Sequence, residues 1–144
     1  MTVQEIIKDK GADVETVPGD ASMAVAVMRL SRLGIGALVV CSDGEHVDGV
    51  LSERDVVRGL ARHGAQLLHM PVRHAMSRGT PTCSPHDTIT EVMAVMTRTR
   101  NRHLPVVDNG RLCGIVSIGD VVKKRLDDLE LEAAVLREHW IVSR

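Results

Sequence analysis

Apolar and polar residues follow two patterns along this chain, and each pattern occurs once in each half. Apolar residues recur at helical spacing over residues 23–32 and 89–98, which predicts an amphipathic helix in each half. Short apolar runs flank Asp43-Gly44 and Asn109-Gly110, dipeptides that are typical of tight β-hairpin turns. The pattern therefore predicts a mixed α/β (α+β) protein with the same elements in both halves.

Each half is predicted to fold as one β-α-β-β-α unit. A short strand over residues 14–17 or 81–83 precedes the amphipathic helix. The hairpin strands are expected at residues 37–41 and 47–51, and again at residues 103–107 and 112–117. A second helix closes each unit, starting near Glu53 and near Ile118.

Helix starts and the segment between the halves can be read from individual residues. Thr88 with Glu91 three residues later predicts a capping box, and Ser22 is the corresponding cap in the first half. Residues 64–70 read as a linker. Pro71 then opens a short helical turn over residues 72–76, which resembles residues 3–7 at the N-terminus.

A sequence repeat underlies the shared pattern. Thr16 lies over Thr82, 66 residues later, and after the hairpin turn GVLSERDVV at residues 49–57 matches GIVSIGDVV at residues 114–122. One unit of about 60 residues is marginally stable alone, so we expect the copies to pack as a pseudo-twofold pair with clefts between them. Residues 1–66 are assigned to the first repeat, 67–126 to the second and 127–144 to a C-terminal helical extension.

Composition narrows the class of protein. The chain has 144 residues, no Phe or Tyr and a single Trp, so the core must be aliphatic. A net charge of −1 argues against a nucleic-acid surface, and no apolar run approaches the length of a membrane span. The N-terminus carries acidic residues where a signal peptide would be basic and then apolar, so we expect a cytoplasmic protein.

The cysteines and histidines give weak signals. Cys41, Cys83 and Cys113 lie in strand-like apolar runs, which favours small buried side chains over a catalytic thiol or a metal site. The seven histidines show no compact metal-binding spacing. We expect no metal, no catalytic residues and no enzymatic activity.

The sharpest signal is a Ser-x-x-Asp that occurs at the same place in both copies. Ser52 with Asp55, and Ser117 with Asp120, follow a glycine and an apolar strand and stand at a predicted helix start. A hydroxyl at a helix N-terminus suits a phosphate, and an aspartate can accept hydrogen bonds from the two hydroxyls of a ribose. The same spacing is also an ordinary capping arrangement, but its duplication in register favours ligand binding.

With these motifs in its two halves, the chain resembles a tandem cystathionine-β-synthase (CBS) domain pair, also called a Bateman module, over residues 1–125. The resemblance implies that Asp55 and Asp120 hold the ribose of adenosine-containing ligands, while Ser52 and Ser117 approach the phosphate. It also implies that basic residues before Leu-Pro in the second copy meet phosphates.

Further candidate ligand-binding residues differ between the copies. Arg102 and His103 precede Leu-Pro in the second copy, where the first copy has Gly36-Ala37, and Arg54 stands opposite Gly119. We therefore expect unequal sites, with Asp120 in the stronger one. The alternative is that Arg102 and His103 lean across to the first site, since the two clefts share a centre. The remaining candidates are residues at or before the first strands: Lys10, Thr16 and Thr82.

The C-terminal segment carries a coiled-coil-like apolar seam with alternating spacings of four and three residues. Its members are Val122, Leu126, Leu129, Ala133, Leu136 and Trp140. The seam is too short for a stable independent coil, so it is expected to dock either on its own domain or on a partner subunit.

These features favour a regulatory, signal-transducing module that senses an adenine nucleotide. The resemblance implies AMP or NAD(H) first, with ADP, ATP and S-adenosylmethionine as further candidates, and no catalytic cofactor. We expect a homodimer that shifts between conformations on binding and is read by an unidentified regulated protein. The alternatives are an oligomerisation scaffold without a ligand and, less favoured, an enzyme acting on a nucleotide.

Overall fold

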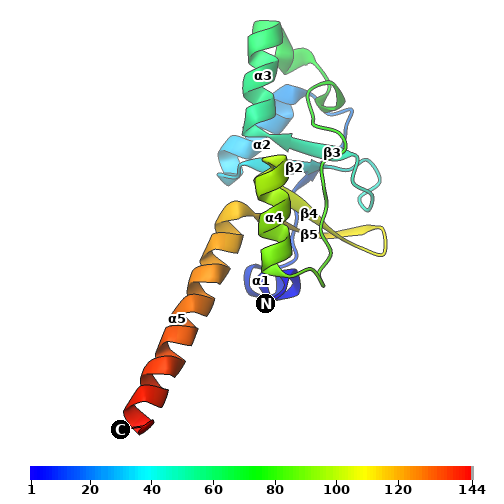
Figure 1. The fold of residues 1–144 in the computed structure, drawn as a ribbon. Helices are drawn as coiled ribbons and strands as arrows, with labels where there is room; N and C mark the ends of the chain where they lie inside the picture. The colour runs from blue at the N-terminus through cyan, green and yellow to red at the C-terminus, as the bar shows by residue number, and fades with distance from the viewer. Residues whose placement is uncertain (144) are drawn as a thin grey trace.

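The computed structural model describes the backbone of residues 1–143 and the side chains of residues 1–140. Two small sheets with helices packed around them form the body, and one long helix leaves it (Figure 1). The elements of the first part are α1 (Val3–Lys10), β1 (Thr16–Val17), α2 (Met23–Leu33), β2 (Ala37–Val40), β3 (Gly49–Ser52), α3 (Glu53–His63), η1 (Gly64–His69) and η2 (Val72–His74). The elements that follow are α4 (Ile89–Thr99), β4 (His103–Asp108), β5 (Arg111–Ser117) and α5 (Ile118–Ser143).

The predicted α/β repeat is confirmed, with one asymmetry in its first strand. In the first half β1 pairs in parallel with β2, and β2 pairs antiparallel with β3. In the second half β4 pairs with β5, but the strand expected at residues 81–83 is reduced to one parallel bridge from Cys83 to Val106. Pro81 and Pro85 flank that bridge, and proline has no N–H with which to extend a ladder.

The helix caps follow the prediction. Ser22 accepts a hydrogen bond from the Val25 N–H at the start of α2. Thr88 and Glu91 form a complete capping box at the start of α4, with distances of 3.1 and 3.2 Å. These local hydrogen bonds fix where each helix enters its half.

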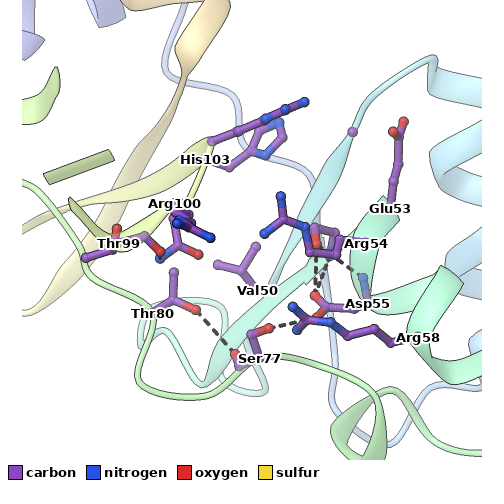
Figure 2. Close-up of a pocket in the computed structure, with 14 residues that line it drawn as sticks. Val50, Glu53, Arg54, Asp55, Arg58, Ser77, Thr80, Thr99, Arg100 and His103 are labelled. Carbon is purple, nitrogen blue, oxygen red and sulfur yellow. Dashed lines mark hydrogen bonds between the residues drawn. The ribbon is translucent and has the colours of Figure 1, made fainter. Parts of the chain in front are cut away.

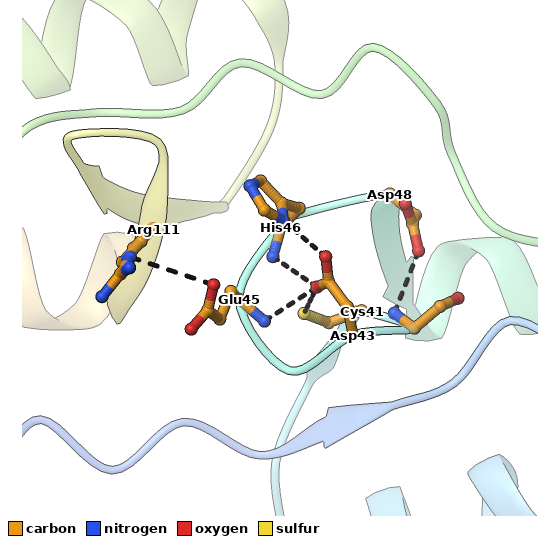
Figure 3. A network of polar contacts seen from close by, with 7 residues as sticks. Cys41, Asp43, Glu45, His46, Asp48 and Arg111 are labelled. Carbon is orange, nitrogen blue, oxygen red and sulfur yellow. Dashed lines mark hydrogen bonds and ion pairs between the residues drawn. The ribbon is translucent and has the colours of Figure 1, made fainter.

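Only one of the two predicted tight turns is present. Asn109 and Gly110 both have positive φ, 52° and 80°, as a type I′ turn requires. In the first half a loop over residues 41–48 replaces the expected Asp-Gly turn. The Asp43 carboxylate accepts hydrogen bonds from the backbone N–H groups of Glu45 and His46, which draws the chain into a wider curve (Figure 3).

That loop also joins the two halves. The backbone N–H of Leu112 donates to the carbonyl of Glu45 at 2.7 Å, and Arg111 lies 3.8 Å from the Glu45 carboxylate (Figure 3). Hydrogen bonds to Asp43 from two N–H groups and from the His46 ring hold the pKa of its carboxyl well below the usual range. Asp43 therefore stays charged and keeps the loop in the shape that meets the second hairpin.

The two hydrophobic cores exchange segments across the middle of the chain. Helix α1 contributes Val3, Ile6 and Ile7 to the core built mainly from the second half. In the other direction, η1 and η2 contribute Leu67 and Val72 to the core of the first half. Residues 64–70, predicted as the linker, connect the halves as a packed 3-10 segment, in which Leu67 is fully buried against Gly59 on α3.

Helix α5 begins against the body and then extends beyond it. Its first turns contact α1, α4 and β5, and Val121 is buried there. The rest projects away from both cores as a straight arm (Figure 1). Intramolecular docking of the apolar seam, one of the two expectations, is contradicted, because Leu126, Leu129 and Leu136 are exposed.

The structure agrees with a structural role for the cysteines. All three are free thiols, Cys41 and Cys83 are buried, and burial raises the pKa of Cys83 to about 12. Within the described part of the chain, no group of three His, Cys, Asp or Glu side chains is placed to hold a metal ion. No described helix is both long and apolar enough to cross a membrane.

Candidate functional site

An open cavity of about 310 Å³ lies where the two halves meet, beside the first Ser-x-x-Asp. The first half and the segment after it contribute β3, the start of α3 and the stretch around Ser77 (Figure 2). The second half contributes the end of α4 and the start of β4. The lining residues are Gly36, Val50, Ser52, Glu53, Arg54, Asp55, Arg58, Ser77, Thr80, Thr99, Arg100, Asn101, Arg102 and His103.

Asp55 is a lining residue whose carboxylate is fixed in place by neighbouring groups. Its side chain is buried, and one carboxylate oxygen accepts hydrogen bonds from the backbone N–H of Ser52 at 2.8 Å and from its hydroxyl at 3.0 Å. The other oxygen accepts a hydrogen bond from the Ser77 hydroxyl at 2.7 Å (Figure 2). The capping interpretation of Ser-x-x-Asp is thus correct for this copy, and it places a fixed carboxylate and two hydroxyls in the cavity wall.

The cavity carries excess positive charge. Four arginines line it against two carboxylates, those of Glu53 and Asp55. Among the described side chains, none of these arginines has a carboxylate within ion-pair distance. The four are Arg54, Arg58, Arg100 and Arg102. Guanidinium groups without carboxylate partners around a concave surface favour an anionic ligand such as a phosphate.

His103 lines the same cavity from the second half, and a glycine opposite it leaves room for its ring. A Cβ atom on Gly36 would lie 3.2 Å from the His103 ring, so the absence of a side chain at Gly36 lets the imidazole approach. Burial lowers the pKa of His103, which keeps the ring neutral near pH 7. The positive charge of the cavity therefore comes from the arginines.

The premise of a stronger second site is wrong, because Arg102 and His103 line the cavity beside Asp55. Strand β4 begins at the boundary between the halves, and its first residues reach across to α3 (Figure 2). Sequence order placed these two residues with Asp120, but the packing of the halves brings them to the Asp of the other copy.

The second Ser-x-x-Asp has a different environment. Ser117 donates its N–H to Asp120 at 2.9 Å and accepts from the Asp120 N–H at 3.1 Å, as in the first copy. Lys10 donates from Nζ to Asp120 at 2.7 Å and to the Ile115 carbonyl at 3.0 Å. Burial would raise the pKa of Asp120, but the hydrogen bonds from Lys10 and Ser117 outweigh it and lower that pKa.

Lys10 thus occupies the place that Ser77 has in the first half. Ser77 pairs with Val50 and bonds Asp55, while Lys10 bonds the carbonyl of Ile115 and Asp120 at the matching repeat positions. The short serine leaves an open cavity beside Asp55, whereas Asp120, whose side chain is 24% exposed, forms an ion pair with the long lysine side chain. Asp120, Ser117 and Gly119 do not line the cavity beside Asp55.

Thr16 and Thr82, two further expected residues, also lie away from the cavity, and several lining residues were missed. Thr82 is exposed, and the carbonyl of Thr16 accepts a hydrogen bond from Arg29 at the edge of the first sheet. The missed residues are Gly36, Val50, Glu53, Arg58, Ser77, Thr80, Thr99, Arg100 and Asn101. Arg100 and Asn101 directly precede Arg102, so the basic segment could have been taken as longer.

Comparison with known proteins agrees with this architecture. The CBS domain model matches residues 3–62 and 72–127. A CBS domain-containing protein of Arabidopsis thaliana, CBSX3, described as mitochondrial, is 30% identical over 96% of this chain, which spans 66% of that protein's length. A crystal structure of a CBS-domain containing protein from Agrobacterium tumefaciens has 43% identity and a TM-score of 0.82, covering 86% of this chain and 92% of that chain.

A more distant structure shows the same fold with ligands bound. The CBS domain pair of protein MJ0100 was solved in complex with 5′-methylthioadenosine and S-adenosyl-L-methionine. It has 20% identity and a TM-score of 0.78, and it covers 89% of this chain and 98% of that chain.

Proposed function

Because the chain belongs to the CBS domain family, we propose that it is a regulatory module that senses a phosphorylated adenine nucleotide in the cavity beside Asp55. The observation that carries this proposal is the combination of a buried, hydroxyl-flanked carboxylate with four arginines that have no described carboxylate partner. A carboxylate suits the ribose hydroxyls, and arginines suit the phosphates.

The ligand would join the two halves. Asp55, Ser52 and Ser77 hold the ribose end from the first half and the segment that follows it, while Arg100 and Arg102 meet the phosphates from the second. A nucleotide bound in this way favours the orientation of the halves in which both sets of contacts are made. The population then shifts toward that orientation by at most the ligand's difference in affinity between the two states.

The charge and size of the cavity favour some family ligands over others. S-adenosylmethionine and 5′-methylthioadenosine carry no phosphate. 5′-Methylthioadenosine offers the arginines no anion, and S-adenosylmethionine offers one carboxylate together with two positive charges, on its ammonium and sulfonium groups. The volume of about 310 Å³ lies at the low end of the range for ligand pockets, roughly 300–1,000 Å³. We therefore favour a mononucleotide such as AMP, bound once per chain, over NAD(H).

Thermal unfolding in the presence of a ligand panel tests this proposal. At a hundred times its dissociation constant, the ligand should raise the free energy of unfolding by about 2.7 kcal/mol. AMP, ADP, ATP, NAD(H), S-adenosylmethionine and adenosine should be compared, with adenosine as the control that lacks phosphate. The proposal is wrong if none of them shifts the melting temperature at millimolar concentration, or if S-adenosylmethionine alone does so.

Arg100 gives a second test because it adopts a backbone conformation that suits glycine. It ends α4 with φ 57°, and the matching residue of the first copy, Gly34, ends α2 with φ 62°. Arg100→Gly should raise the free energy of unfolding by up to about 1 kcal/mol while weakening nucleotide binding. Urea unfolding and calorimetric titration measure the two effects, and unchanged affinity would remove Arg100 from the site.

The scaffold and enzyme alternatives have less support. A scaffold without a ligand would not require the arginine-lined cavity, and we propose no catalysed reaction for this chain. We propose that the module forms a homodimer and passes its state to another, unidentified protein. The cytoplasmic location expected from the sequence stays a prediction.

A further inference from the structure

Helix α5 exposes a continuous apolar face. Val122, Leu126, Leu129 and Leu136 are 47%, 55%, 42% and 68% exposed, although residues of this type are usually covered. Val121 faces the body, and successive helical residues are turned by about 100°, so the seam that starts at Val122 points to the side of the body. Such a seam on a projecting helix indicates an interaction surface.

The residues flanking the seam carry a charge pattern that favours a parallel pairing of two α5 helices. In a heptad register with Leu126 and Ala133 at a and Leu129 at d, Arg125 and Glu132 occupy g positions. Glu130 and Arg137 occupy the e positions that g residues meet in a parallel pair. Arg125 would then face Glu130 of a second copy, and Glu132 would face Arg137 of that copy.

The antiparallel arrangement with full overlap is unfavourable. Antiparallel helices bring e positions against e positions and g against g. Glu130 would then meet Glu130 of the second copy, and Glu132 would meet Glu132 of that copy. Lys123 would meet Arg137, which adds a pair of like positive charges.

We propose that α5 is a parallel coiled-coil dimerisation element whose occupant is the α5 seam of a second copy of this chain. The inference deepens the homodimer of the proposed function by naming its surface and orientation. It places both bodies at the same end of the paired helices, so that contacts between the bodies supplement a seam that is too short to form a stable coil by itself. It does not depend on the nucleotide site.

Matched leucines on α5 test the surface. Leu129 lies in the seam, whereas Leu131 is 65% exposed but lies outside it, so Leu129→Asp and Leu131→Asp add the same charge in different places. By light scattering at about 100 µM, where a micromolar dimer is well populated, wild type and Leu131→Asp should be dimers and Leu129→Asp a monomer. Monomers throughout, or dimers throughout, would overturn the proposal.

Single cysteines test the orientation. Equivalent a positions face each other only in a parallel, in-register pair, so Ala133→Cys should form a disulfide-linked dimer under mild oxidation. Leu131→Cys and wild type are the controls and should remain uncrosslinked. A dimer in which Ala133→Cys also fails to crosslink would overturn the parallel arrangement. The nucleotide-induced thermal shift should persist in Leu129→Asp, which separates this outcome from failure of the proposed function.

Discussion

Asp55→Ala is expected to weaken nucleotide binding by at least tenfold, while Asp120→Ala changes it little. Asp55 lies in the wall of the arginine-lined cavity, and Asp120 bonds to Lys10 instead. A hydrogen bond to a charged group contributes about 1.5–3 kcal/mol, and about 1.4 kcal/mol corresponds to a tenfold change in affinity. Calorimetric titration of the favoured nucleotide into each variant measures the difference.

Stability must be followed in the same variants, because Asp55 also caps α3. Loss of a cap lowers the free energy of unfolding by about 0.5–2 kcal/mol. The titrations should therefore be carried out well below the melting temperature of each variant. Asp55→Asn, which retains much of the shape, is the milder companion variant. An equal loss of affinity in Asp55→Ala and Asp120→Ala would mean that the second Ser-x-x-Asp also binds nucleotide and that Lys10 moves aside.

Leu67→Ala should produce the largest loss of stability, about 2–5 kcal/mol. The side chain is fully buried in the first core, and its methyl groups occupy the space that a Cβ on Gly59 would need. Removing them leaves a cavity between η1 and α3 that the short helices cannot fill. Urea unfolding monitored by circular dichroism gives the free energy directly.

The neighbouring residue provides the control. Leu68 is the same residue type in the same 3-10 helix but is 38% exposed, so Leu68→Ala should change the free energy of unfolding by less than about 1 kcal/mol. If Leu67→Ala unfolds no more easily than Leu68→Ala, η1 only connects the halves and adds little to the stability of the first core.

Features decided by neighbouring residues were predictable from the sequence. The Thr88–Glu91 capping box and the Asn109-Gly110 turn both depend on contacts within a few residues, and both are present. The repeat also located Ser52 and Asp55 at the start of α3. In each case the hydrogen-bond partner lies close in sequence, so no knowledge of packing was needed.

Features decided by packing were not predictable. The packing of the two halves brings Arg102 and His103 close to Asp55. No pattern of neighbouring residues indicates which half the end of a strand will face. The wide loop after β2 depends on how the Asp43 carboxylate is used, although Asp-Gly alone suggests a tight turn. The burial of Leu67 could not be predicted from its place in the linker, because the glycine that it packs against, Gly59, lies eight residues earlier on α3.

The exchange of segments between the cores sets an order for folding during synthesis. The first core uses residues between Val17 and Met76, so it can close once that stretch has left the ribosome. Helix α1 is made before the residues of the first core but packs on a core that extends to Val121, so its apolar face must wait until that residue has left the ribosome. Until then Val3, Ile6 and Ile7 remain open to solvent or to a chaperone. A segment that is synthesised before either core is complete is therefore among the last to become buried.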